Sequence, residues 1–277
     1  MLMPKKPRVL VAMSGGVDSS VAAALLVEQG YDVIGITMQV WDYSANSCDI
    51  QQGNGTCCSS IDVEDARAVA DHLNIPFYVM NCEAKFKSHV IDDFVGGYLE
   101  GRTPIPCVNC NTFLKFDHLF QKMHELDCDY LATGHYAQIK QSSSGKLGIV
   151  TSSDDWKDQT YFLFTMNPDR LKFLMFPVGD WEKPRLREYA ENMNLPVARK
   201  KDSTGICFIG KNNYADFVEQ HSEQSQLKPG ELKLYPSGKV LGTHSGIHNF
   251  TFGQRKGLGV SYKSPLYVIK IDPETHE

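Results

Sequence analysis

The segment from Ser14 to Ser20, SGGVDSS, has the residue types of a phosphate-binding loop. Apolar, β-branched residues over 8–13 predict a buried strand before it, and residues 18–29 predict a helix after it. A Gly-rich turn between a strand and a helix directs backbone N–H groups and the positive end of the helix dipole at an anion. The segment therefore predicts a phosphate site, in which we expect Asp18 to help to place Mg²⁺.

The loop differs from the two common nucleotide-binding loops. No lysine follows its glycines, as a Walker A loop requires, and the G-x-G-x-x-G spacing of a dinucleotide-binding loop is absent. Without a lysine on the β- and γ-phosphates, transfer of the γ-phosphoryl group is less favoured than attack at the α-phosphorus, which releases pyrophosphate. We therefore expect ATP as the ligand and an adenylated substrate as the intermediate.

Two of the eight cysteines lie in segments that favour a reactive thiolate. Cys110 precedes a predicted helix over 112–126, and Cys207 follows a pair of lysines and a turn. A helix N-terminus or a nearby cation lowers the pKa of a thiol and makes its thiolate nucleophilic. Cys107 and Cys110 form a C-x-x-C pair, but a structural zinc site usually needs a second pair. An iron–sulfur cluster on Cys107, Cys110 and Cys207 stays an alternative.

The other cysteines carry weaker signals. Cys48, Cys82 and Cys128 have contexts that predict passive thiols, whereas Cys57 and Cys58 leave metal binding and no role equally open. In a reducing cytosol the set does not predict a disulfide scaffold.

Strands alternate with helices over the first half of the chain. Further strands are predicted at 32–38, 76–80 and 129–133, and further helices at 63–73, 84–99 and 112–126. This alternation predicts a parallel sheet covered on both faces by helices, the doubly wound α/β class.

From residue 136 the pattern changes. A hairpin is predicted over 136–150, and helices at 158–165, 168–174, 184–194 and 213–220. The segments KPGELKL, YPSGKVLGTH, GQRKGLGV and PLYVIKID predict short strands. We therefore expect a catalytic domain over 1–210 and a small β-rich domain over 211–277.

Composition limits location and partners. The chain has 277 residues, 42% of them hydrophobic, which is enough for one large domain or two ordinary ones. No apolar run approaches the roughly 20 residues of a membrane span, and the N-terminus lacks a signal peptide. These features predict a cytoplasmic protein that has no membrane partner. The net charge of −5 disfavours a general nucleic-acid binder, although basic patches at 199–201 and 255–256 can hold phosphates.

Eight motifs in order resemble the tRNA-specific 2-thiouridylase family of the N-type ATP pyrophosphatases. They are SGGVDSS, GITMQVW, GRTP with CN-x-x-x-KF, ATGHY, KDQTYFLF, FPVG, KKDSTGICFIG and GQRKGLG, and they span residue 8 to about residue 270. The resemblance implies an adenine nucleotide alpha hydrolase-like sheet domain followed by a small β-rich central domain. Family members usually continue into a C-terminal β-barrel, and we expect this barrel to be missing here.

The resemblance also implies a reaction. ATP adenylates the C2 carbonyl oxygen of the wobble uridine in the tRNA anticodon, and sulfur from a cysteine persulfide then replaces that oxygen. By motif, Cys207 carries the persulfide, which a sulfur-carrier protein delivers, and Cys110 is the catalytic nucleophile. Attack by Cys110 frees sulfide or leaves a Cys110–Cys207 disulfide that must be reduced.

Further roles follow from the same resemblance. ATP contacts are implied for Ala12, Met13, Ser14, Gly15, Gly16, Val17, Asp18, Ser19, Met38 and Gly134. Contacts with tRNA or with the target base are implied for Ile105, Pro106, Cys107, Lys157, Asp158 and Gln159. Many relatives have Asn-Pro-Asp where this chain has Ile105-Pro106-Cys107. A thiol cannot replace a carboxylate at neutral pH, so the general acid/base is left open, with Asp158 and a substrate phosphate as candidates.

Two other functions stay open. A different N-type ATP pyrophosphatase would adenylate a small substrate, but this reading leaves the two cysteine segments unexplained. A truncated chain that binds tRNA or metal without catalysis is the third possibility.

Overall fold

The computed structural model describes residues 6–40, 60–203, 205–209 and 213–277. These residues form two compact units. Apart from those gaps, the first unit holds residues 6–86 and 107–209, and the second holds 87–106 and 213–277. The second unit thus takes in a stretch that the domain prediction placed in the first, and the boundary after residue 210 stays a prediction.

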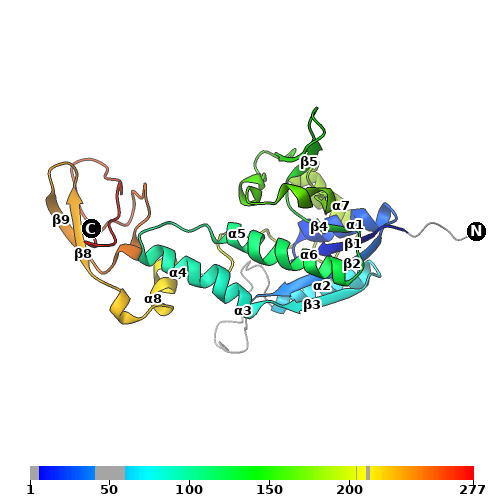
Figure 1. The fold of residues 1–277 in the computed structure, drawn as a ribbon, viewed down its shortest axis with the longest axis horizontal. Helices are drawn as coiled ribbons and strands as arrows, with labels where there is room; N and C mark the ends of the chain where they lie inside the picture. The colour runs from blue at the N-terminus through cyan, green and yellow to red at the C-terminus, as the bar shows by residue number, and fades with distance from the viewer. Residues whose placement is uncertain (1–5, 41–59, 204, 210–212) are drawn as a thin grey trace, which may run out of the picture. The chain divides into compact units, whose positions relative to one another are not determined.

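A five-stranded parallel sheet forms the centre of the first unit (Figure 1). The strand order is β3-β2-β1-β4-β7, with bounds β1 (Arg8–Ala12), β2 (Asp32–Gln39), β3 (Phe77–Asn81), β4 (Tyr130–Thr133) and β7 (Leu174–Met175). Val9 of β1 lies opposite Val33 of β2 on one side and Tyr130 of β4 on the other. The chain adds strands first on one side of β1 and then on the other, so the predicted doubly wound α/β fold is confirmed.

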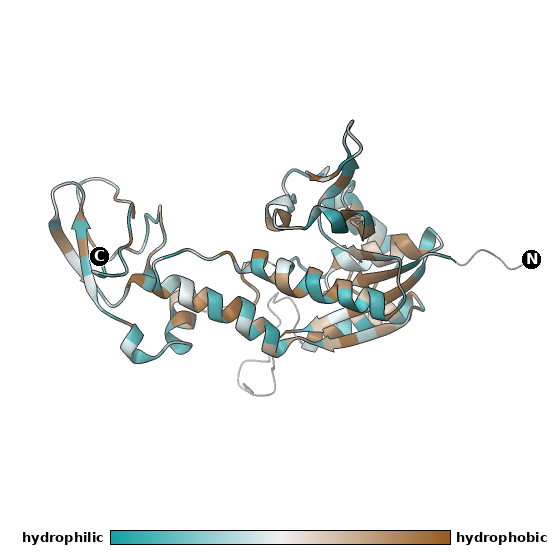
Figure 2. Cartoon of the chain, in the orientation of Figure 1, coloured by the Kyte–Doolittle hydropathy of each residue, from teal (hydrophilic) through white to brown (hydrophobic). Residues whose placement is uncertain are grey.

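The central strands are apolar because both of their faces are covered. Every residue over 9–11 of β1 and over 33–38 of β2 is buried. Figure 2 shows the strands of this sheet as largely hydrophobic. Continuous apolar runs of this kind are typical of parallel strands that lie between two layers of helices.

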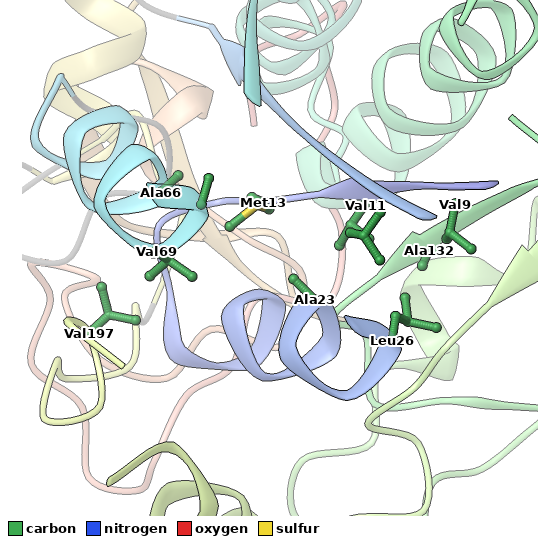
Figure 3. Packing of buried hydrophobic residues seen from close by; sticks show 11 residues of the cluster. Val9, Val11, Met13, Ala23, Leu26, Ala66, Val69, Ala132 and Val197 are labelled. Atoms are coloured by element: carbon green, nitrogen blue, oxygen red, sulfur yellow. The ribbon is translucent and has the colours of Figure 1, made fainter. Parts of the chain in front are cut away.

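Helices α1 (Val17–Glu28) and α2 (Ser60–His72) pack against one face of the sheet. Figure 3 shows Ala23 and Leu26 of α1 and Val69 of α2 in one cluster with Val11 of β1. Helix α7 (Lys183–Asn192) packs against α1, and α6 (Asp117–Glu125) packs against β1 and β4. Full burial of one Leu or Val side chain stabilises by about 1.5–3 kcal/mol, so this core holds the turn between β1 and α1 in place.

Two predicted long helices contain π-helical segments. The helix expected over 84–99 is observed as α3 (Glu83–Phe86), the π-helix η1 (Lys87–Ile91) and α4 (Asp92–Leu99). The helix expected over 112–126 is observed as α5 (Pro106–Asn109), the π-helix η2 (Cys110–Phe116) and then α6. π-helical turns within helices are rare and frequently accompany functional sites.

The helices predicted at 158–165 and 168–174 are observed as short 3₁₀ helices. They are η3 (Thr160–Leu163) and η4 (Pro168–Phe173). Asp158 Oδ1 accepts a hydrogen bond from the Thr160 N–H at 3.2 Å, and Asn167 Oδ1 accepts one from the Asp169 N–H at 2.9 Å. Such local side-chain bonds compete with the α-helical pattern and favour short turns. The predicted hairpin is confirmed as β5 (Gln138–Gln141) paired antiparallel with β6 (Leu147–Val150).

The second unit contains η1, α4, α8 (Tyr214–Gln220), η5 (Gln224–Gln226), β8 (Gly230–Leu234), β9 (Lys239–His244) and η6 (Ile247–Asn249). The Tyr98 ring of α4 stacks on Tyr214 of α8 at 4.6 Å between ring centroids. The strands predicted in KPGELKL and YPSGKVLGTH are observed as β8 and β9, and they pair antiparallel. In the described part of this unit no closed barrel is formed.

The strands predicted at 253–260 and 265–272 are not observed. Gly253, Gly257 and Gly259 have φ of 81°, 77° and 71°, which turns the backbone out of the extended conformation. Two backbone hydrogen bonds still join the segments, from Gly253 N–H to the Val268 carbonyl at 2.8 Å and from Val268 N–H to the Gln254 carbonyl at 3.0 Å. Among the residues described, no helix is both long and apolar enough to cross a membrane.

Candidate active site

The Ser14–Ser20 loop lies at the carboxyl end of β1, beside the point where the strand order reverses. β1 is the neighbour of β4, and Gly134 directly follows β4. In doubly wound sheets, ligands bind in the crevice outside the carboxyl ends of the strands at this reversal. The fold therefore brings Gly134 and the predicted phosphate loop together although they are far apart in the sequence.

Two glycines allow the backbone to approach closely here. Gly15 has φ of 69°, and a Cβ atom on it would lie 2.2 Å from the Asp62 carbonyl oxygen. A Cβ atom on Gly134 would lie 2.5 Å from the Ser19 backbone nitrogen at the start of α1. Both positions therefore exclude every side chain, and the first turn of α1 and the turn after β4 are packed backbone to backbone.

Serine hydroxyls hold the loop in shape. Ser19 Oγ donates to the Gly16 carbonyl at 3.1 Å and accepts from the Ser14 N–H at 3.1 Å, and Ser20 Oγ donates to the same Gly16 carbonyl at 2.9 Å. The helix N-cap is Gly16, which has no side chain to occupy the first N–H groups of α1. This arrangement fits a phosphate group, because open N–H donors and the helix dipole converge on the loop.

Two lysines from distant parts of the chain reach the loop. Lys183 Nζ lies 2.6 Å from Asp18 Oδ1, which also accepts a hydrogen bond from the Tyr136 hydroxyl at 2.9 Å. Lys200 Nζ donates to the Gly15 carbonyl at 3.0 Å and pairs with Asp62 Oδ1 at 2.6 Å. Burial and the Asp18 carboxylate raise the pKa of Tyr136, so its hydroxyl stays protonated and donates.

Sequence reasoning missed these loop partners. It noted that no lysine follows the glycines, and it named Lys200 only as part of a basic patch and as one of the two lysines before Cys207. Lys183 stands 165 residues from Asp18, and Lys200 stands 185 residues from Gly15. No local pattern marks either lysine as a partner of the loop, because the packing of α7 against α1 creates these contacts.

Asp202 is a second centre of charge in the first unit. Its carboxylate pairs with Lys157 at 2.7 Å, Lys183 at 2.9 Å and Arg187 at 2.5 Å. Burial opposes ionisation of this carboxyl, but hydrogen bonds from Lys157 and Lys183 outweigh it and lower its pKa to about 2. The carboxylate is therefore ionised at any pH at which the protein works.

The side chains of Lys157, Asp158 and Gln159 all make contacts within the unit. Asp158 accepts from the Ser152 N–H at 2.8 Å and from the Thr160 hydroxyl at 2.5 Å, and Gln159 accepts from the Tyr136 N–H at 3.0 Å. Burial raises the pKa of Asp158, but these hydrogen bonds outweigh it and the net shift is downward. An ionised carboxylate disfavours Asp158 as the general acid, and the tRNA contacts of the three residues stay a prediction.

The segments that carry Cys110 and Cys207 both pack on α3. The Phe208 ring, next to Cys207, lies 5.6 Å from the Phe86 ring of α3. Helix η2, which begins at Cys110, also contacts α3. Both cysteines are partly accessible. The fold thus gathers on one short helix two segments that stand about a hundred residues apart.

The expected helix N-terminus at Cys110 is not observed. Helical backbone already begins at Pro106, the start of α5, so Cys110 lies one turn inside a helical run. Proline favours the first helical position because its missing N–H needs no partner there. The helix-dipole argument for a low Cys110 pKa is therefore wrong.

Cys82, beside Cys110, is buried, and burial raises its pKa to about 11, which supports its interpretation as a passive thiol.

The remaining predicted contact residues are placed as follows. Ala12 ends β1, and Met38 is buried near the carboxyl end of β2, one strand away from the loop. Ile105 is 38% exposed, Pro106 is buried and Cys107 lies inside α5. Within the described residues, no group of three or more His, Cys, Asp or Glu side chains is arranged to hold a metal ion. The predictions for Cys48, Cys57 and Cys58 lie outside the described residues.

His135, which follows Gly134, predicts a pH dependence of stability. Burial and the nearby Lys115 lower its pKa below the ordinary 6.5. Because the unfolded chain then binds the proton more tightly, stability contributed by neutral His135 is lost as the pH falls below about 6.5. We expect the free energy of unfolding to fall by up to about 1.4 kcal/mol per pH unit in this range from this group.

Urea unfolding between pH 8 and pH 5 measures this slope. The variant His135→Asn should show a shallower slope than the unchanged protein. Equal slopes for the two proteins would contradict the assignment to His135.

The sheet defines an α/β domain of the doubly wound class, and the loop at the strand reversal with its two lysines forms a candidate phosphate site. Two family models match the chain: one described as the tRNA methyl transferase HUP domain over residues 7–211, and one described as the tRNA methyl transferase PRC-barrel domain over residues 215–277. Since relatives named tRNA-specific 2-thiouridylase are 48% identical to this chain over 99% of its length, the chain belongs to the tRNA-specific 2-thiouridylase family.

Named relatives support this assignment. The chain is 48% identical to "tRNA-specific 2-thiouridylase MnmA" of Geotalea uraniireducens, over 99% of its own length and 72% of that protein. It is also 48% identical to the protein of the same name from Clostridioides difficile, over 99% of its own length and 74% of that protein.

Among solved structures, NMN synthetase from Francisella tularensis has a TM-score of 0.45 at 14% identity, covering 80% of this chain and 81% of that one.

Proposed function

We propose that this chain is a tRNA 2-thiouridine synthase, a sulfurtransferase that uses ATP. The observation that carries the proposal is that one unit holds the phosphate loop, with its two lysines, and the segments of Cys110 and Cys207, both packed on α3. Family membership supports the same reaction, because the relatives are named for it. The substrate is the wobble uridine of a tRNA anticodon.

Activation of the uridine occurs at the loop. The C2 carbonyl oxygen attacks the α-phosphorus of ATP, pyrophosphate leaves, and AMP becomes attached to that oxygen. The open N–H groups of α1 and the ammonium groups of Lys183 and Lys200 stabilise the charge on the leaving pyrophosphate. Asp18, which lies in the loop and pairs with Lys183 at 2.6 Å, would hold Mg²⁺, which supplies further charge neutralisation when bound.

Sulfur transfer uses the two cysteines. Cys207 bears the persulfide, and the Cys110 thiolate attacks the Cys207 sulfur of that persulfide. A Cys110–Cys207 disulfide forms and hydrosulfide leaves. The hydrosulfide attacks C2 of the adenylated uridine, AMP departs with the oxygen, and two external thiols later reduce the disulfide. An iron–sulfur cluster is the less favoured alternative, since the described residues arrange no metal-binding group around Cys107, Cys110 and Cys207.

A sulfur-carrier protein and a cytoplasmic location complete the proposal. The persulfide sulfur has to be delivered to Cys207 by a donor that itself carries a persulfide. Reduced cysteines are required both before delivery and after turnover, and a reducing compartment maintains them.

The test is to incubate unmodified tRNA with the protein, ATP and a persulfide donor, and to measure 2-thiouridine in digested tRNA by mass spectrometry. The expected result is one 2-thiouridine per substrate tRNA, with AMP and pyrophosphate released in equal amounts. If AMP release depends on a small amine or acid and not on tRNA, the protein is instead a ligase of small molecules. Binding of tRNA without any AMP release would leave only a binding protein.

A further inference from the structure

The predicted ATP, sulfur and tRNA segments meet at the carboxylate of Asp202. Its Oδ2 accepts a hydrogen bond from Lys157 Nζ at 2.7 Å. Its Oδ1 lies 2.9 Å from Lys183 Nζ and 2.5 Å from an Arg187 guanidinium nitrogen. Lys183 Nζ also lies 2.6 Å from Asp18 Oδ1 in the phosphate loop. One lysine therefore links Asp202 directly to the loop.

The residues that are linked through Asp202 come from different predicted sites. Asp18 is part of the phosphate loop, and Lys157 begins the triplet for which tRNA contact is predicted. Asp202 itself opens the segment DSTGIC, which ends at Cys207. Asp202 therefore puts the start of the segment that is predicted to bear the sulfur in contact with Lys157 and, through Lys183, with the loop.

Burial makes these charges sensitive to one another. The side chain of Lys183 is only 9% exposed and that of Asp202 is 24% exposed. Ion pairs away from bulk water are screened less than surface pairs, and loss of one partner leaves an uncompensated charge. The downward shift of the Asp202 pKa by its lysines agrees with strong coupling in this network.

A second contact, made by Lys200, also connects this segment with the phosphate loop. Lys200, near the start of the same segment, donates to the Gly15 carbonyl at 3.0 Å and pairs with Asp65 at 2.5 Å. The contact of Lys183 with Asp18 and that of Lys200 with Gly15 both involve the phosphate loop, and in both the lysine contributes an ammonium group. A bound triphosphate would attract those ammonium groups and so compete with the present partners of Lys183 and Lys200.

We propose that Asp202 is a positioning residue that sets the placement of Cys207 according to whether the phosphate loop holds a triphosphate. In the structure Lys183 links Asp202 to Asp18, and this link restrains Asp202 at the start of the segment. Occupancy of the loop draws Lys183 toward the phosphates, loosens Asp202 and gives Cys207 greater access. Because Cys207 becomes more accessible only after the nucleotide has bound, sulfur would not be released from the Cys207 persulfide before the uridine can be activated. The biological meaning rests on the proposed function, but the coupling itself is measurable without tRNA.

The experiment measures the alkylation rate of Cys207 by limiting iodoacetamide, with peptide mass spectrometry as readout. It is run with and without Mg²⁺ and the ATP analogue that carries a methylene group between the α- and β-phosphates. The analogue should speed alkylation of Cys207 at least about fivefold, the lower end of typical coupling between sites. In Asp202→Asn the rate without analogue should already be high, and the analogue should add less than about twofold.

Two control variants make the result specific. Asp202→Glu keeps the charge and should retain the response to the analogue. Asp32→Asn removes an aspartate that pairs with Arg8 at 2.7 Å at the opposite end of the sheet, and it should behave as the unchanged protein. The affinity for the analogue is measured for each variant, so that every rate is compared at saturation.

Hydrogen–deuterium exchange on the unchanged protein gives a second measurement that needs no variant. The analogue should raise exchange in the peptide over 201–209. The proposal is overturned if saturation with the analogue changes neither the alkylation rate of Cys207 nor the exchange over 201–209. It is also overturned if Asp202→Asn keeps the full response to the analogue. Failure to form 2-thiouridine, with the coupling present, would instead remove the proposed function alone.

Discussion

Replacement of Cys207 by serine is expected to abolish 2-thiouridine formation while leaving activation of the uridine intact. A serine hydroxyl cannot carry a persulfide, so the fall in thiolation rate should be at least about 10³-fold, as for removal of other nucleophiles. Single-turnover assays should still show tRNA-dependent release of pyrophosphate. Thiolation is measured as 2-thiouridine in digested tRNA.

Cys110→Ser should block the reaction one step later. The sulfur donor still loads Cys207, so the Cys207 peptide should retain one additional sulfur atom by mass spectrometry, with no 2-thiouridine formed. The matched control is Cys128→Ser. Cys128 is a buried thiol whose pKa burial raises to about 11, and it precedes the amino end of β4, away from the loop. Full thiolation by Cys110→Ser or Cys207→Ser would reject the two-cysteine mechanism.

Gly134→Ala is expected to have the largest effect on nucleotide binding. Its Cβ atom would lie 2.5 Å from the Ser19 nitrogen and 2.7 Å from the Asp18 carbonyl carbon, so the start of α1 has to move. Overpacking of this kind costs about 1–3 kcal/mol of stability. Displacement of the loop donors should weaken binding of a non-hydrolysable ATP analogue at least about tenfold, because charge-assisted hydrogen bonds depend on geometry.

Calorimetry of analogue binding and urea unfolding measure the two effects separately. Gly148→Ala in β6 is the matched control, because a Cβ atom there meets nothing within 4 Å. It should bind the analogue as the unchanged protein does. If Gly134→Ala also binds the analogue within twofold of the unchanged protein, the loop after β4 does not border the nucleotide.

The parts of the fold that were predicted correctly depend on local signals. The apolar run of β1, the glycines after it, and Asp18 and Gly30 near the two ends of α1 are all close together in the chain, and together they specify a strand, a turn and a helix. The strands β2 to β4 and the hairpin of β5 and β6 follow from the same kind of pattern. Alternation of strands with helices then leads to a parallel sheet, since parallel strands need crossover connections.

Helix type and second-unit strands were predicted less well. Whether a helical stretch becomes α, π or 3₁₀ depends on small differences in hydrogen bonding, as the side chains of Asp158 and Asn167 show. The segments 253–260 and 265–272 have strand-like composition, but a strand also needs a partner along its length. Glycines with positive φ prevent that pairing here.

The sequence by itself predicted the chemistry of this protein, from a candidate phosphate loop without its own lysine and from two cysteines in segments that a family resemblance assigns to sulfur transfer. Only the tertiary structure decided which charges complete the site. Lys183 reaches the loop through its ion pair with Asp18, and Lys200 reaches it through a hydrogen bond to the Gly15 carbonyl. Asp202 pairs with Lys157 and with Lys183, both distant from it or from the loop in sequence. The physical reason is that an ion pair depends on distance in space, and packing of α7 against α1 sets that distance, whereas no spacing along the chain records it.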